Sequence, residues 1–290
     1  MFEGFEQRRI DADGVAINLR MGGSGPPLLL LHGYPQTHVM WHKVAPALAE
    51  RFTVVCADLR GYGDSAKPKS DSSHSPYSKR AMAWDQVLVM AALGFERFAA
   101  AGHDRGARVV HRLCLDHREA VTRAAMLDIV PTLTMFAEMN KEVALGYWHW
   151  LFLAQPYDLP ERMIAADPDW YLKGRLARWG QGLEYFDPEA IAEYCRCFAD
   201  PEAIHASCED YRAAATIDLE HDKADLARKI ECPLLVLWGA RGLLPRWFDV
   251  AATWRARARN VTARALDTGH FLAEEKPEET ANALMEFFLV

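Results

Sequence analysis

Asp104 stands between two glycines, in a segment whose spacing is typical of a catalytic turn. The residues GHDRG at 102–106 follow the apolar run 98–101 and precede a helical pattern over 109–117. A strand, a Gly-x-nucleophile-x-Gly turn and a helix form a nucleophile elbow, which lifts one side chain clear of a sheet. A carboxylate attacks saturated carbon and becomes an ester whose carbonyl belongs to the protein. The sequence therefore predicts alkyl transfer through Asp104.

A nucleophile of this kind needs a general base and an acid that orients the base. His270 follows the apolar run 261–266. Proteins with a nucleophile elbow keep their general base at such a strand end near the C-terminus. After the run 234–238, the position that often holds the acid is occupied by Gly242. Asp128, which ends another apolar run, is therefore the predicted partner of His270.

Two backbone N–H groups are expected to point at the same place. The segment HGYP at 32–35 follows the buried-strand run 27–31. We expect the N–H of Tyr34 and that of Arg105, the residue after the nucleophile, to form an oxyanion hole.

Strand and helix patterns alternate along the chain, which predicts an α/β fold with a mostly parallel, doubly wound sheet. Alternating residues around Asp13-Gly14 indicate a hairpin between residues 8 and 20. The predicted strands are Pro27–Leu31, Thr53–Asp58, Phe98–Gly102, Ala124–Asp128, Leu234–Trp238 and Thr262–Leu266. The predicted helices are Trp41–Arg51, Ser78–Leu93, Arg105–His117, Trp247–Arg257 and Pro277–Phe288.

This alternation stops between about residues 131 and 222, where helix formers and aromatic side chains predominate and no strand run is clear. We interpret this segment as a helical cap inserted after the strand that ends at Asp128. The predicted division is a core domain of residues 1–130 and 222–290 and a cap domain of residues 131–221. A chain of 290 residues, half of them hydrophobic, suits that arrangement.

Composition argues against several classes of function. No run reaches the ~20 apolar residues of a membrane span, and the first six residues lack the basic and apolar regions of a signal peptide. The six cysteines show neither disulfide nor zinc spacing, so we expect a cytoplasmic protein. A net charge of −7 argues against nucleic acid and anionic membranes as partners.

Taken together, these residues resemble an α/β-hydrolase-fold haloacetate dehalogenase, of the group that includes the fluoroacetate dehalogenases. The similarity runs along nearly the whole chain. The HG-x-P and GYG-S motifs are shared by many α/β-hydrolases, whereas the arginines beside Asp104 and the HW pair and Tyr211 of the cap are far more specific. The blocks that carry the resemblance are HGYPQTHVMWHKVAP (32–46), DLRGYGDSAKP (58–68), GHDRGARVVHRL (102–113), LDIVPT (127–132), YWHWLFLAQP (147–156), EDYRAAATIDLEHD (209–222) and GHFLAEEKPEE (269–279).

The resemblance implies a hydrolase that cleaves carbon–halogen bonds. Asp104 would displace halide from C2 of a haloacetate, and water activated by His270, with Asp128 as its acid, would hydrolyse the ester to glycolate. Neither a metal nor an organic cofactor is implied. The partners would be a small anionic 2-haloacid and the halide ion, and a homodimer fits the family.

By the same resemblance, Arg105 and Arg108 would hold the substrate carboxylate, and His149, Trp150 and Tyr211 would bind the departing halide. The two arginines are three residues apart on the first turn of a predicted helix, so they share a face. Cations there oppose the helix dipole by about 0.3–1 kcal/mol, a cost that a bound anion reverses. Arginine also grips a carboxylate in a fixed orientation.

Two other functions stay open on the sequence. An epoxide hydrolase uses the same triad and ester, and Tyr147 with Tyr211 could be its two lid tyrosines. That family usually carries Trp where this chain has Arg105, and a buried arginine pair does not suit a neutral epoxide. The third possibility is a hydrolase-like binding protein without activity, against which the intact nucleophile, acid and base argue.

Some of these residues also have purely structural interpretations. Asp104 and Asp128 could cap helices, because aspartate is common at helix starts. Arg105 and Arg108 could pair with an acid such as Asp58 or Glu119 instead of with substrate. Trp179 could line the pocket or belong to the packing of the cap.

Overall fold

One eight-stranded sheet forms the centre of the computed structural model, which describes residues 1–290. Its strands are β1 (Glu6–Ala12), β2 (Val15–Gly22), β3 (Pro27–Leu31), β4 (Thr53–Ala57), β5 (Phe98–His103), β6 (Val121–Leu127), β7 (Leu234–Gly239) and β8 (Val261–Leu266). Their order across the sheet is β1-β2-β4-β3-β5-β6-β7-β8. The predicted hairpin, β1 with β2, is antiparallel, as is β2 with β4, and all other pairs are parallel. The predicted fold class is confirmed.

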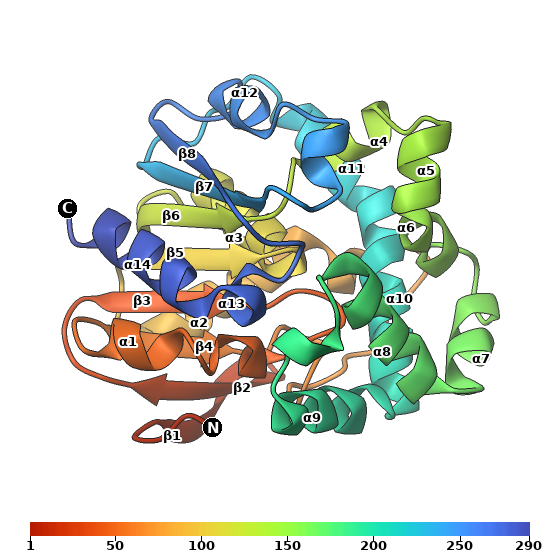
Figure 1. Ribbon diagram of the computed structural model, residues 1–290, viewed down its shortest axis with the longest axis horizontal. Helices are drawn as coiled ribbons and strands as arrows, with labels where there is room; N and C mark the ends of the chain where they lie inside the picture. The colour runs from red at the N-terminus through yellow and green to blue at the C-terminus, as the bar shows by residue number, and fades with distance from the viewer.

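Helices cover both faces of this sheet. In Figure 1, α1 (Ala45–Ala49), α13 (Leu272–Glu275) and α14 (Pro277–Phe288) lie in front of it, and α2 (Lys79–Ala92) and α3 (Arg105–Asp116) lie behind it. A short helix, α12 (Val250–Arg255), packs against β7 and β8. Because both faces are covered, the central strands are buried and read as continuous apolar runs, such as PLLLL in β3 and TVVCA in β4.

Two predicted helices are shorter in the structure than in the sequence analysis. The segment 41–51 is α-helical only in α1, after a 3₁₀ turn at His38–Trp41, and Pro46 favours a helix start at this point. The segment 247–257 becomes helical at Val250, where Asp249 caps α12 by accepting from a backbone N–H. Further 3₁₀ turns span Ser75–Tyr77, Leu183–Tyr185 and Leu244–Arg246.

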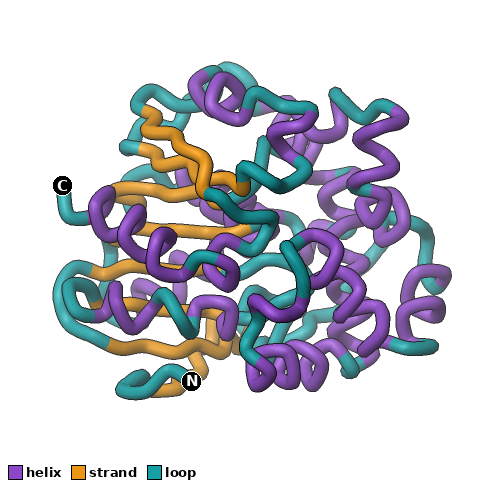
Figure 2. The backbone as a smooth tube through the Cα atoms, in the orientation of Figure 1, coloured by secondary structure: helices purple, strands orange, loops and turns teal.

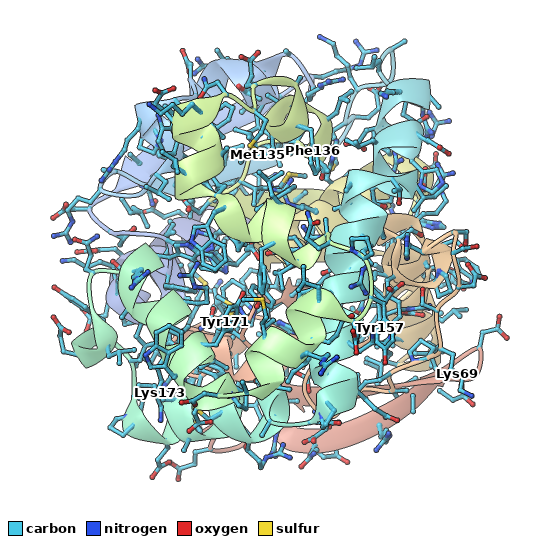
Figure 3. The ribbon with its side chains drawn as sticks, turned by 90° about the vertical axis from the view of Figure 1, so that its right-hand side faces the viewer. Lys69, Met135, Phe136, Tyr157, Tyr171 and Lys173 are labelled. Atoms are coloured by element: carbon cyan, nitrogen blue, oxygen red, sulfur yellow. The ribbon has the colours of Figure 1, made fainter.

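The chain between β6 and β7 forms helices only. They are α4 (Thr132–Ala137), α5 (Lys141–Gly146), α6 (Trp148–Leu153), α7 (Leu159–Ala165), α8 (Pro168–Trp179), α9 (Pro188–Phe198), α10 (Pro201–Ala215) and α11 (Ile217–Ala224). Figure 2 shows this helical block beside the sheet, and Figure 3 faces it, with Tyr171 near its middle. The division into core and cap stays a prediction, and α11 runs across its boundary at 221/222. No helix in the protein has the length and apolar content needed to cross a membrane.

Three strand ends meet at the edge of the sheet that faces the inserted helices. β5 and β6 are parallel neighbours with His103 opposite Leu127, so the residues that follow them, Asp104 and Asp128, emerge side by side. β8 is parallel to β7 with Leu266 opposite Gly239, so the loop that carries His270 begins at the same edge. Parallel α/β sheets place their ligand sites at this edge, because the loops after the strands gather there.

Candidate active site

The turn between β5 and α3 presents Asp104 at the carboxyl edge of the sheet. Its φ of +47° lies in a region that costs energy for any residue with a Cβ and that is typical of functional turns. The flanking glycines are required by close packing. A Cβ at Gly102 would lie 2.5 Å from the backbone nitrogen of Ala107, and one at Gly106 would lie 2.4 Å from the carbonyl oxygen of His32.

His270 lies between two carboxylates. Its Nδ1 is 2.5 Å from Oδ2 of Asp128, and its Nε2 is 3.9 Å from Oδ2 of Asp104. The other oxygen of Asp128 accepts a hydrogen bond from the backbone N–H of Gly239, at the end of β7, at 2.9 Å. The structure thus brings together the three residues that the sequence analysis combined. Asp128 thus contacts the end of β7, close to Gly242, the position that often holds the acid.

The loop that carries His270 is held by a residue that sequence reasoning missed. The buried carboxylate of Glu275 accepts from the N–H groups of Gly269, at 2.6 Å, and Phe271, at 3.1 Å, one on each side of the histidine. The N–H of His270 donates to the carbonyl of Trp179, the last residue of α8, at 3.0 Å. Acids are common at helix starts, so Glu275 gave no distinct signal in the sequence.

The charges around the nucleophile favour its reactive form. Burial raises the pKa of Asp104, but the charge of His270, and then those of nearby basic side chains, hold this pKa below its usual range. The N–H of Tyr34 also donates to Oδ1 of Asp104 at 2.9 Å. Burial lowers the pKa of His270, but the hydrogen bond to Asp128 and its charge outweigh burial and raise this pKa above its ordinary value.

A small cavity of about 20 Å³ lies beside the nucleophile. Its lining residues are Asp104, Asp128, Tyr147, His149, Trp179, Leu243 and His270. Such a volume holds little more than one water molecule. Trp179, for which the sequence allows either a place in the pocket or in the packing of the cap, is one of these lining residues. Tyr147, which the sequence analysis considers only as a lid tyrosine of an epoxide hydrolase, also lines the cavity. Leu243 has no signal in the sequence, because an isolated leucine after a strand carries no pattern.

Arg105 and Arg108 do not line this cavity, but their charges help to lower the pKa of Asp104. Both are buried, at 0% and 4% exposure. Arg105 is paired with an acid, as the structural interpretation allowed, but the acid is Asp210 of the inserted helices. Nη1 of Arg108 donates to the carbonyl of Val130 at 2.9 Å and to the hydroxyl of Thr132 at 3.0 Å. Burial, and then repulsion from Arg105, lowers the pKa of Arg108 to about 10, so this side chain stays charged at neutral pH.

The three predicted halide donors gather around the arginines. The ring of Tyr211 is 5.6 Å from that of His149 and 5.7 Å from that of Trp150, measured between centroids. The guanidinium carbon of Arg105 lies 4.2 Å from the Tyr211 ring, and that of Arg108 lies 4.5 Å from the Trp150 ring. Of the three, only His149 lines the small cavity.

Four buried polar atoms in this group have no partner within the protein. They are Nη1 of Arg105, Nε of Arg108, Nδ1 of His149 and the hydroxyl of Tyr211. Burial lowers the pKa of His149 and raises that of Tyr211, so both side chains are neutral at pH 7. A buried polar group without a hydrogen bond costs about 1–3 kcal/mol, and native proteins pair nearly all of them. The two guanidinium nitrogens and the phenol can all donate, so together they suit an anion.

Elsewhere the structure offers no comparable constellation. No group of three or more His, Cys, Asp or Glu side chains could hold a metal ion. A hollow of about 560 Å³ lies between the loop at 67–70 and helices α7 and α10. None of the predicted site residues lines it.

Comparison with known proteins identifies the scaffold that carries these residues. Residues 26–277 match the family described as alpha/beta hydrolase fold. The chain belongs to the α/β-hydrolase family. Among its α/β-hydrolase relatives, a fluoroacetate dehalogenase from Burkholderia sp is 52% identical over 99% of this chain and 95% of its own length. A soluble epoxide hydrolase from Corynebacterium sp. (strain C12) is 34% identical over 95% of this chain and 94% of its own length.

A solved α/β-hydrolase structure agrees closely with the present one. An alpha/beta hydrolase from Nostoc sp PCC 7120 superposes with a TM-score of 0.98 at 58% identity, covering 99% of both chains. The resemblance inferred from the sequence motifs is confirmed at the level of the family.

Proposed function

We propose that this α/β-hydrolase is a haloacetate dehalogenase, which converts fluoroacetate or a related short 2-haloacid and water to glycolate and halide. The observation that carries the proposal is the set of four unpaired buried polar atoms beside a carboxylate nucleophile. A 2-haloacid brings acceptors only, a carboxylate and a developing halide. The 52% identity to a fluoroacetate dehalogenase supports the same choice.

In the first step, Asp104 displaces the halide. Its Oδ1 is held by the Tyr34 N–H, so we assign the attack to Oδ2, the oxygen that faces His270. Oδ2 forms a bond to C2 of the haloacid as the carbon–halogen bond breaks, and the halogen leaves with the bonding electrons. Arg105 and Arg108 orient the substrate carboxylate, and His149, Trp150 and Tyr211 stabilise the departing halide.

In the second step, water hydrolyses the ester. His270 removes a proton from water, and the resulting hydroxide attacks the Asp104 carboxyl carbon, while Asp128 stabilises the imidazolium. The N–H groups of Tyr34 and Arg105 stabilise the oxyanion. Collapse of the intermediate releases glycolate and restores the Asp104 carboxylate, and the proton on His270 is lost to solvent.

A halide-release panel tests the proposed reaction against its nearest rival. We expect the purified protein to release halide from fluoroacetate and chloroacetate and to leave styrene oxide unchanged. The reason is that a neutral epoxide brings no anion to pair with the free Nη1 of Arg105 and the free Nε of Arg108. Ion-selective detection of fluoride and chloride, with chromatography of the diol, gives both readouts. Diol formation without halide release would favour the epoxide hydrolase, and a lack of both would favour a silent binding protein.

Tyr211→Phe tests the halide site. We expect kcat with fluoroacetate to fall by about 10²–10³-fold, as for the loss of one oxyanion donor, with a smaller loss for chloroacetate. Fluoride leaves poorly and is strongly hydrated, so it depends more on hydrogen bonds than chloride does. Tyr185→Phe, a partly exposed tyrosine outside the cavity, is the matched control. Equal losses for the two substrates would contradict a role at the halide.

We further propose a cytoplasmic homodimer formed through the inserted helices. Several large apolar side chains on and between α6 and α8 are exposed, among them Tyr157 at 72%, Met163 at 61% and Trp170 at 70%. Tyr157 is labelled on the face shown in Figure 3. Exposed apolar groups of this kind are typical of protein–protein contacts. The mass of the particle in solution, measured by light scattering, distinguishes a dimer from a monomer, and Trp170→Glu should favour the monomer.

A further inference from the structure

Asp210, on helix α10, is the centre of a fully buried ion cluster. Its carboxylate takes two hydrogen bonds from Arg105, from Nε to Oδ2 at 2.9 Å and from Nη2 to Oδ1 at 2.6 Å. Nη2 also donates to the backbone carbonyl of Asp210 at 2.9 Å. Neither side chain is exposed to solvent. Burial raises the pKa of Asp210, but the charges of Arg105 and Lys79 outweigh it, so the carboxylate is ionised.

Two further groups of the core bind the same carboxylate. The ammonium of Lys79 contacts Oδ1, and the hydroxyl of Tyr62 donates to Oδ2 at 2.7 Å. Lys79 begins α2, Arg105 begins α3, and Tyr62 follows β4, so one residue of the inserted helices contacts three separate segments around the sheet. A bidentate pair with this support holds a guanidinium in one plane.

This pairing determines which part of Arg105 is left for a ligand. Because Asp210 occupies Nε and Nη2, Nη1 is the one nitrogen of this guanidinium without a partner. The residue next to Asp210 is Tyr211, whose ring lies 4.2 Å from the guanidinium carbon. A single turn of α10 therefore carries both the carboxylate that orients Arg105 and the hydroxyl proposed to face the halide.

We propose that Asp210 is a positioning residue for the substrate carboxylate, which acts by fixing Arg105 so that Nη1 points at the bound anion. This inference rests on the proposed function and adds to it a residue that does not touch substrate. Because Asp210 holds Arg105 in place, the arginine is a preorganised donor, and its side chain loses little conformational freedom when the haloacid binds.

Asp210→Asn tests the inference in the full-length protein. An amide keeps the size of the carboxylate but loses its charge and one acceptor, so Arg105 loses its bidentate partner. We expect KM for chloroacetate, and the inhibition constant of acetate as an unreactive anion, to rise about 10–100-fold. The kcat should fall by a smaller factor, because binding of the carboxylate is common to substrate and transition state.

Asp218→Asn is the matched control. Asp218 is buried in the same cluster and lies 3.8 Å from the Lys79 ammonium, but it has no hydrogen bond to Arg105. A general loss of a buried acid would therefore act in both variants, whereas loss of positioning acts in Asp210→Asn alone. Equal increases in the acetate constant in the two variants, or no increase in Asp210→Asn, would overturn the inference. If the wild-type protein releases no halide, it is the proposed function that fails.

A second variant keeps the inference testable should Asp210→Asn not fold. In Arg105→Lys, the side chain has a single nitrogen. That nitrogen would pair with Asp210, so no donor would be left for the ligand. We therefore expect Arg105→Lys to bind acetate as weakly as Arg105→Met, although the positive charge is retained. Acetate binding within threefold of wild type in Arg105→Lys would show that charge alone is enough, which overturns the positioning role.

Discussion

Replacing Asp104 with asparagine should stop halide release, lowering turnover by at least about 10⁴-fold. An amide is a poor nucleophile toward saturated carbon, and no other carboxylate in the cavity is free, since Asp128 is engaged by His270 and Gly239. The measurement is chloride release in the first minutes after purification. Mass spectrometry of the proteolytic peptide that contains residue 104 shows whether the amide has deamidated.

Asp267→Asn is the matched control for this variant. It makes the same chemical change three residues before His270, at an exposed side chain that pairs only with the exposed Arg241. Its turnover should stay within about twofold of wild type, as for most surface substitutions. Release of halide at the wild-type rate by intact Asp104→Asn would refute a covalent role for this carboxylate. A single turnover in ¹⁸O-water should place the label in Asp104 of the wild-type protein.

Replacing His270 with alanine should divide the reaction into its two halves. Alkylation needs no base, so each site should release one halide in a burst, after which turnover falls by about 10³–10⁴-fold. The 104 peptide should then carry the added mass of a carboxymethyl group. The burst itself reports that the variant is folded and its nucleophile intact. An unmodified peptide after exposure to chloroacetate would contradict the ester intermediate.

The same assignment predicts the pH dependence of the wild-type protein. His270 must be neutral to accept a proton from water, and its pKa is raised above 6.5 by Asp128. Turnover should therefore rise with pH through that raised pKa and fall as the pH drops below it. The pKa of Asp104 is held below 3.8, so protonation of the nucleophile should appear only in more acidic solution. A rate that increases as the pH is lowered from 8 to 5 would contradict the role of His270 as base.

The gathering of Asp104, Asp128 and His270 could be predicted from the sequence because each of them follows a recognisable strand. Parallel strands place their carboxyl ends at one edge, so Asp104, Asp128 and His270 were expected at the same edge once the strands were recognised. The turn at Asp104 carried its own signal in two glycines that close packing requires. Local patterns of this kind need no knowledge of how distant segments pack.

The partners of the arginines could not be predicted in the same way. The pairing of Arg105 with Asp210 joins residues 105 positions apart, and nothing in either local sequence indicates it. Asp58 was a reasonable candidate, but it is buried against His38 instead. The contribution of Leu243 to the cavity wall could not be predicted for the same reason. It depends on how a loop of the core packs against the inserted helices.

The small size of the hollow beside Asp104 has a consequence for the timing of the reaction. A haloacid is several heavy atoms larger than the single water that about 20 Å³ admits, and the nucleophile is only 7% exposed. We therefore expect the proposed reaction to need a transient widening of this cavity, which Trp179 lines, when the haloacid enters and when glycolate leaves. Such gating can govern overall speed, and it also shields the carboxylate from unrelated alkylating agents.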